Sequence, residues 1–126
     1  MIDTSKKVLA VDGFSTMLRI VRSLLNQIGF NDIDEASDGK AALDLFEQNE
    51  YGLVISEWNM EPMSGYEFLK RVRAGDRNHD VPFIMVTSES KAENVLKAKQ
   101  AGVSNYIVKP FNAETLKTKI EMSLKD

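Results

Sequence analysis

The 126-residue chain contains no cysteine, which excludes disulfides, thiol catalysis and zinc sites built from cysteine. Its one histidine, His79, lies in the polar stretch GDRNHD and is interpreted as a surface residue. No long apolar run is present, and the opening stretch MIDTSKKVLAVDG contains neither a secretory signal nor a membrane span. We therefore expect a cytoplasmic protein.

The common nucleotide-binding motifs are missing as well. The sequence has no G-x-x-x-x-G-K-[ST] loop and no G-x-G-x-x-G after its first apolar run. The turn DGFST is too poor in glycine and hydroxyl groups to resemble a loop that binds a flavin phosphate. A net charge of −3 indicates neither a nucleic-acid partner nor an anionic membrane surface.

The length and a hydrophobic share of 43% predict one domain over residues 1–126, with a core of its own. Charge is distributed unevenly along the chain. Residues 1–60 carry 10 acids and 5 bases, whereas residues 61–126 carry 9 acids and 11 bases. The acidic half is therefore the first place to look for a site.

Short apolar runs alternate with helical patterns along the chain. The runs are Val8–Val11, Ile33–Ala36, Leu53–Ser56, Phe83–Val86 and Tyr106–Val108. The helical patterns are carried by 17–28, 41–46, 68–72, 95–98 and 116–124, where Leu96 is one of the apolar positions. We expect Ser15, Asp38 and Asn112 to be N-caps, and Gly29 and Gly102 to end helices. Five such repeats predict an α/β fold with a five-stranded, doubly wound parallel sheet.

In such sheets ligands bind just beyond the carboxyl ends of the strands. Asp12, Glu57, Thr87 and Lys109 stand at four of these ends. Each suits phosphate chemistry: a carboxylate can attack phosphorus, and clustered carboxylates bind Mg²⁺. A hydroxyl and an ammonium group neutralise phosphoryl oxygens. Together these residues predict a phosphate-handling site, although each alone is more typical of a solvated strand end.

The sequence resembles the receiver domain of bacterial two-component systems, in particular the chemotaxis response regulators. The similar segments are VDGFSTMLRIVRSLL, GFNDIDEASDGKAAL, YGLVISEWNM, MSGYEFLKRVRA, PFIMVTSESKAENVLKAKQAGVSNYIVKPF and the final helix. They cover nearly the whole chain, so the resemblance implies a single receiver domain over residues 1–126 with no room for an output domain. The resemblance implies the flavodoxin-like (βα)5 fold with strand order 2-1-3-4-5.

In that family a histidine kinase transfers a phosphoryl group to an acidic side chain, and Mg²⁺ binds beside it. The resemblance places the phosphoacceptor at Glu57 and the Mg²⁺ ligands at Asp12, Glu57 and the backbone carbonyl of Asn59. It makes Thr87 the switch hydroxyl and Lys109 the phosphate-pairing base. It implies no enzymatic activity beyond hydrolysis of the protein's own acyl phosphate, which we expect to be weak or absent here.

The resemblance also implies an output face, built from the fourth helix, fifth strand and fifth helix. Its residues here are Ser90, Lys91, Tyr106, Val108, Phe111 and Lys119. An apolar patch rimmed by lysines suits an acidic amphipathic segment, such as that of a flagellar motor switch protein. Tyr106 is the aromatic side chain that turns inward on activation, and Lys109–Pro110 is expected to be a cis bond. We expect a monomer.

Two departures from the family fall in the site itself. The acceptor is Glu57 rather than aspartate, and Gly13 replaces the second acid of the pair. A third change is that Glu61 precedes Pro62, where the family usually has proline directly after the triplet that corresponds to WNM. One extra methylene moves a carboxylate by roughly 1.5 Å, and a misplacement of about 1 Å can cost about a hundredfold in rate. Mg²⁺ tolerates distorted coordination badly.

We therefore expect weak or absent Mg²⁺ binding and impaired phosphorylation. Glu57 is long enough to form an internal ion pair with Lys109, or to reach Thr87, and such a contact could mimic activation. Two alternatives stay open. One is a phosphorylation-silent scaffold that competes for chemotaxis partners; the other is a flavodoxin-type electron carrier, which the turn DGFST disfavours.

Overall fold

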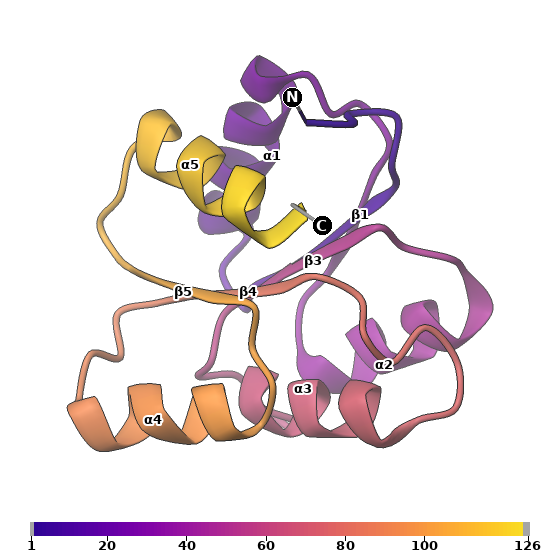
Figure 1. Ribbon diagram of the computed structural model, residues 1–126, viewed down its shortest axis with the longest axis vertical. Helices are drawn as coiled ribbons and strands as arrows, with labels where there is room; N and C mark the ends of the chain where they lie inside the picture. Colours follow the sequence, from indigo (N-terminus) through magenta and orange to yellow (C-terminus); the bar gives the residue numbers. More distant parts are fainter. Residues whose placement is uncertain (1, 125–126) are drawn as a thin grey trace.

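Five short strands alternate with five helices in the computed structural model, which describes residues 2–124 (Figure 1). The strands are β1 (Val8–Val11), β2 (Ile33–Ala36), β3 (Leu53–Ser56), β4 (Phe83–Thr87) and β5 (Asn105–Val108). The helices are α1 (Ser15–Ile28), α2 (Gly39–Gln48), α3 (Gly65–Ala74), α4 (Ala92–Gln100) and α5 (Ala113–Leu124). All five predicted strands are confirmed; β4 runs one residue further, to Thr87, and β5 starts one residue earlier, at Asn105.

The strands form one parallel sheet in the order β2-β1-β3-β4-β5, as predicted. Val11 pairs in register with Ser56, so Asp12 and Glu57 leave neighbouring strands at the same level. Thr87 pairs with Val108, which places Lys109 just beyond the end of β4. The register therefore brings all four predicted strand-end residues to one edge of the sheet.

Helices cover both faces of the sheet, with α1 and α5 on one side and α2, α3 and α4 on the other (Figure 1). Side chains that alternate along a strand reach opposite faces. Val8 and Ala10 of β1 pack in the core beneath α1 and α5, whereas Leu9 and Val11 pack against the α2 and α3 side. Two buried cores, one on each face, thus hold the sheet.

The predicted helix ends are confirmed except at the start of α1. Asp38 accepts hydrogen bonds from the N–H groups of Lys40 and Ala41, as an N-cap should. Asn112 Oδ1 likewise accepts from the N–H of Thr115 at 2.8 Å. Two glycines have the positive φ angles expected after a helix, 124° at Gly29 and 97° at Gly102.

The prediction that Ser15 caps α1 is wrong. Ser15 is the first helical residue, and the N-cap is Phe14, whose side chain makes no capping hydrogen bond. The Asp12 carboxylate accepts the N–H of Phe14 at 3.0 Å. The acid at the end of β1 therefore ties the turn that leads into α1, and no hydroxyl is needed at the cap.

The helix predicted from Val95, Leu96 and Ala98 is present as α4, but Leu96 lies outside the core, with 54% of its side chain exposed. Ala98 is the buried residue of this helix. Positions two residues apart lie on different sides of a helix, so a helix that buries Ala98 turns Leu96 outward. His79 is exposed, as predicted. No helix within residues 2–124 is long and apolar enough to cross a bilayer.

Candidate functional site

The ammonium group of Lys109 lies between two carboxylates at the carboxyl edge of the sheet. Its Nζ is 2.8 Å from Glu57 Oε1 and 3.0 Å from Asp12 Oδ2. Both carboxylates are buried, with 7% of the Glu57 side chain and 4% of the Asp12 side chain exposed. The predicted ion pair of Glu57 with Lys109 is therefore present, and Asp12 shares the same cation. We call Asp12, Glu57 and Lys109 the strand-end triad.

The remaining carboxylate oxygens of the triad accept backbone N–H groups. Glu57 Oε2 accepts from Trp58 at 2.6 Å and from Asn59 at 3.2 Å, and Asp12 Oδ1 accepts from Phe14. Buried charges are stable only when they are paired and hydrogen-bonded. One cation and three N–H donors thus compensate two buried anions.

The triad also shifts the pKa of Lys109. Burial by itself lowers the pKa of an ammonium group, but the hydrogen bonds and negative charges of Glu57 and Asp12 outweigh burial. The net result is that the pKa of Lys109 is raised above its ordinary value. The lysine therefore stays charged in the site at neutral pH.

The turn after β3 holds Glu57 in place through a close approach of α3. The N–H of Gly65 donates to the carbonyl of Trp58 at 2.8 Å, and a Cβ at Gly65 would lie only 1.8 Å from the Glu57 carbonyl oxygen. The Trp58 ring stacks on Tyr66 at 4.8 Å, nearly parallel. Sequence reasoning missed Gly65; its signal was a glycine in the first turn of a helix, where other residues are preferred.

Thr87 lies at the neighbouring strand end but makes a different contact. It is fully buried, and its Oγ1 accepts the N–H of Glu89 at 3.1 Å. Among the hydrogen bonds of the described residues, none joins Thr87 to Glu57. The alternative contact of Glu57 with Thr87 is therefore not the one formed; Lys109 takes that place.

The predicted output residues belong to β5, to α5 and to the loops that follow β4 and β5. Ser90, Lys91 and Val108 are exposed, while Tyr106, Phe111 and Lys119 are partly buried. The Tyr106 hydroxyl donates to the carbonyl of Glu89 at 2.7 Å. Burial, and then the charges of Glu89 and Glu57, raise the pKa of Tyr106 to about 12. Tyr106 is thus held against the loop that begins at Thr87.

Two cis peptide bonds precede prolines near the site, and only one of them was predicted. Lys109–Pro110 is cis, as predicted. Glu61–Pro62 is a second cis bond, which was not predicted. It lies in the stretch MEPMSG, where the position of the proline already distinguished this sequence from the family.

In this arrangement the residues present do not fit a magnesium ion. Mg²⁺ requires hard oxygen ligands in near-ideal octahedral geometry, but Lys109 holds one oxygen of each triad carboxylate and backbone N–H groups hold the other. Gly13 adds no side-chain ligand, so the Asn59 carbonyl would be the one predicted ligand that neither Lys109 nor the backbone N–H groups of the site engage. Within residues 2–124 no group of three or more acidic, histidine or cysteine side chains is arranged to bind a metal ion.

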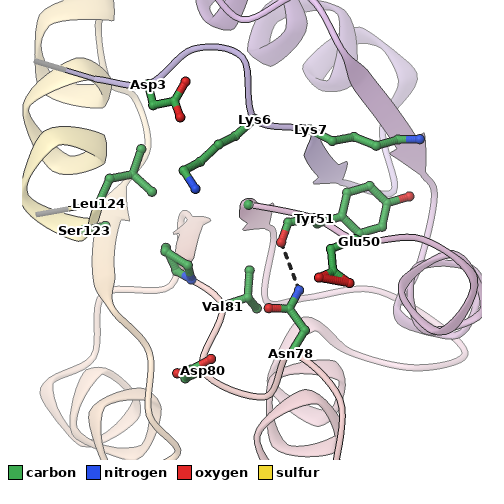
Figure 2. A pocket seen from close by; sticks show the side chains of 12 residues that line it. Asp3, Lys6, Lys7, Glu50, Tyr51, Asn78, Asp80, Val81, Ser123 and Leu124 are labelled. Atoms are coloured by element: carbon green, nitrogen blue, oxygen red, sulfur yellow. Dashed lines mark hydrogen bonds between the residues drawn. The ribbon is translucent and has the colours of Figure 1, made fainter. Parts of the chain in front are cut away.

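The largest cavity among the described residues lies at the opposite edge of the sheet and contains none of the predicted site residues (Figure 2). It measures about 710 Å³ and is lined by residues that precede β1, β3 and β4, together with the end of α5. Its charges are mixed. Lys7 pairs with Asp34, and Glu50 lies 3.7 Å from Arg77. The Lys6 stem packs on Gly52, where a Cβ would lie 2.7 Å from it.

Comparison with known proteins agrees with this geometry. Residues 8–121 match the response regulator receiver domain family. The chain is 45% identical to the chemotaxis protein CheY-3 of Vibrio cholerae over 121 residues, which cover 96% of this chain and 93% of the relative. Among solved structures, CheY4 of Vibrio cholerae superposes with a TM-score of 0.88 at 35% identity and covers 96% of this chain and 100% of its own.

A more distant structure shares the fold alone. The receiver domain of the sensor kinase PA1611 from Pseudomonas aeruginosa has a TM-score of 0.87 at 20% identity, and covers 97% of this chain and 99% of its own. That structure holds a magnesium ion in its active-site cleft.

The chain belongs to the response regulator receiver domain family. Within that family it is CheY-like in sequence and in structure. The family match gives no support to the alternative of a flavodoxin-type electron carrier.

Proposed function

We propose that this chain is a CheY-like response regulator of chemotaxis signalling whose site is set by an internal lysine instead of by metal-dependent phosphorylation. Its proposed partners are a histidine kinase and an acidic segment of a flagellar motor switch protein, which it meets as a cytoplasmic monomer. The similarity to a chemotaxis protein over nearly its whole length supports the signalling role.

The position of Lys109 Nζ carries the proposal about the site. The ammonium group bridges both acids of the strand-end triad, where the family resemblance would place metal and phosphate. Glu57, whose side chain is one methylene longer than aspartate, contacts this cation at 2.8 Å. The carboxylate and ammonium then occupy the positions in which an incoming phosphoryl group would need to be aligned, and alignment dominates the rate of in-line transfer.

The contacts of Tyr106 are consistent with an output face that adopts its binding conformation without phosphorylation. Its hydroxyl is bound to the Glu89 carbonyl, and Glu89 in turn is tied to Thr87. A chain of hydrogen bonds therefore joins the edge of the site to the proposed docking face. We propose that this face is available to its target without phosphorylation.

The test compares the wild type with the double variant Gly13→Asp/Glu57→Asp. An aspartate side chain has room at position 13, since a Cβ built on Gly13 lies 3.7 Å from the Ser37 carbonyl and 3.9 Å from Met60. Each protein is treated with acetyl phosphate and Mg²⁺, and its intact mass is measured. We expect a gain of one phosphoryl group in the double variant and none in the wild type.

Tryptophan fluorescence in the same samples reports metal binding, because Trp58 is hydrogen-bonded to Glu57. Fluorescence should respond to millimolar Mg²⁺ in the double variant only. Efficient labelling of the wild type at Glu57 would overturn the proposal. Each single substitution serves as a control that separates loss of the metal ligand from the length of the acceptor.

The pairing of Lys109 with Asp12 and Glu57 also favours a second candidate function. In this alternative the chain is a phosphorylation-silent scaffold that competes for the same partners. Glu57→Gln distinguishes the two, because it removes the charge that Lys109 pairs with. If target-peptide affinity changes in Glu57→Gln, the site controls the output face. Unchanged affinity favours the scaffold.

A further inference from the structure

A groove opens beside the strand-end triad, on the side away from the output face. It measures about 580 Å³ and lies between the loops that follow β1, β2 and β3. Its lining residues are Gly13, Phe14, Ser37, Asp38, Asn59, Met60, Glu61 and Ser64. Since β4 and β5 lie on the other side of β3, this groove is separate from the surface formed by α4, β5 and α5.

Phe14 provides an apolar wall that nothing in the described chain covers. Its side chain is 71% exposed, the highest value among the exposed large hydrophobic residues of the described chain. The Asp12 carboxylate holds the Phe14 N–H, and Phe14 is the N-cap of α1, so the backbone of Phe14 is held at the rim of the groove. Met60 is half-buried on the neighbouring loop. An exposed aromatic at a hollow is typical of an interaction site.

The charge of the groove has one sign. Asp38 and Glu61 line it, and none of its described lining residues is a lysine, arginine or histidine. The nearest cation in sequence, Lys40, pairs with Asp44 at 3.1 Å. The amide groups at the start of α2 compensate part of the Asp38 charge, which leaves the exposed Glu61 as the main uncompensated anion.

The floor of the groove is open because residue 13 is glycine. The space next to it is bordered by the Ser37 carbonyl, a hydrogen-bond acceptor. We infer that the groove binds a short basic segment of a partner protein, with an arginine or lysine directed to Glu61 and an apolar residue packed on Phe14 and Met60. Opposite charges would steer such a segment to this face, and the apolar contact would hold it there.

The experiment is an NMR titration of the ¹⁵N-labelled protein with the peptide acetyl-Arg-Leu-Arg-amide, with acetyl-Glu-Leu-Glu-amide as the charge control. We expect saturable shifts of the amides of Gly13, Asn59 and Glu61 with the basic peptide only. Glu61→Gln and Phe14→Ser should each weaken binding by at least about fivefold. Both side chains are exposed, so these variants should fold normally.

Matched controls lie on α4, on the other side of the molecule. Glu93→Gln removes another exposed acid, and Leu96→Ser removes another exposed apolar side chain; neither should change the affinity. The inference is overturned if the groove amides do not shift, if the acidic peptide shifts them equally, or if the controls weaken binding as much. Groove shifts that depend on protein concentration alone would assign the groove to a second copy of the chain. Groove shifts caused by Mg²⁺ alone would assign it to a metal ion. Either result would also overturn the inference.

Discussion

Lys109 Nζ and Glu57 Oε1 are 2.8 Å apart at a site where only 14% and 7% of the two side chains are exposed. Removing two such charges from water is costly, and the attraction between them offsets that cost only while both are present. Asp12 adds a second buried anion that pairs with the same ammonium group. The attraction of one cation must therefore offset the desolvation of two carboxylates. The lysine is therefore the residue on which the local structure depends.

Replacing Lys109 by methionine should lower the free energy of unfolding by about 3–5 kcal/mol, because two buried carboxylates lose their cation. Urea denaturation at pH 7 measures the change. The surface variant Lys40→Met, which breaks an exposed pair with Asp44, should cost no more than about 0.5 kcal/mol. The double variant Lys109→Met/Glu57→Gln should recover part of the loss. A Lys109→Met protein as stable as the wild type would show that the ion pairs contribute nothing.

Gly65→Ala should destabilise the protein strongly, because the added methyl group would lie 1.8 Å from the Glu57 carbonyl oxygen and 2.8 Å from Ser56 Oγ. The backbone must move, and the movement displaces the turn that holds Glu57. We expect a loss of at least about 2 kcal/mol in unfolding free energy and altered Trp58 fluorescence. Gly75→Ala at the other end of α3, where the methyl group meets only atoms 3.5 Å away, should change neither. Equal stability of the two variants would refute the close approach.

The fold was predictable because the pattern is repeated five times. Each apolar run is a strand, and in β1, β3 and β4 every residue is buried, as expected for a parallel sheet covered on both faces. The sequence-based expectations differ from the structure where tertiary contacts determine how a helix begins or which of its sides is buried. Asp12 replaces a capping hydroxyl at α1, and α4 is anchored at Ala98, which turns Leu96 to solvent.

The site was predictable only in its side chains. Strand ends and the family resemblance named Asp12, Glu57 and Lys109, and the length of Glu57 predicted its contact with the lysine. The backbone donors from Phe14, Trp58 and Asn59 could not be predicted, since every residue except proline carries the same N–H group. The cis bond at Glu61–Pro62 and the groove beside it depend on how three loops meet, which no local pattern encodes.

The pKa of Tyr106 predicts how stability depends on pH at alkaline values. An unfolded tyrosine loses its proton near pH 10, whereas burial and the nearby charges of Glu89 and Glu57 raise the pKa of Tyr106 to about 12. Between these values the unfolded chain binds fewer protons than the folded one, so stability falls as pH rises. Urea unfolding between pH 9 and pH 11 should show a steeper fall in the wild type than in Tyr106→Phe. Parallel curves would contradict the raised pKa.

Substitution by alanine at the start of α1 and at the start of α2 should have different effects on the free energy of unfolding. Asp38 accepts two N–H groups of α2 at 2.7 and 3.0 Å, so Asp38→Ala should lower the free energy of unfolding by about 1 kcal/mol. Asp38→Asn keeps an acceptor oxygen and should recover most of that loss. Ser15 is already inside α1 and has no capping role, so Ser15→Ala should change stability by less than about 0.5 kcal/mol. Urea denaturation of the three variants decides the matter: a larger loss at Ser15 than at Asp38 would mean that the hydroxyl, and not the Asp12 carboxylate, secures the start of α1.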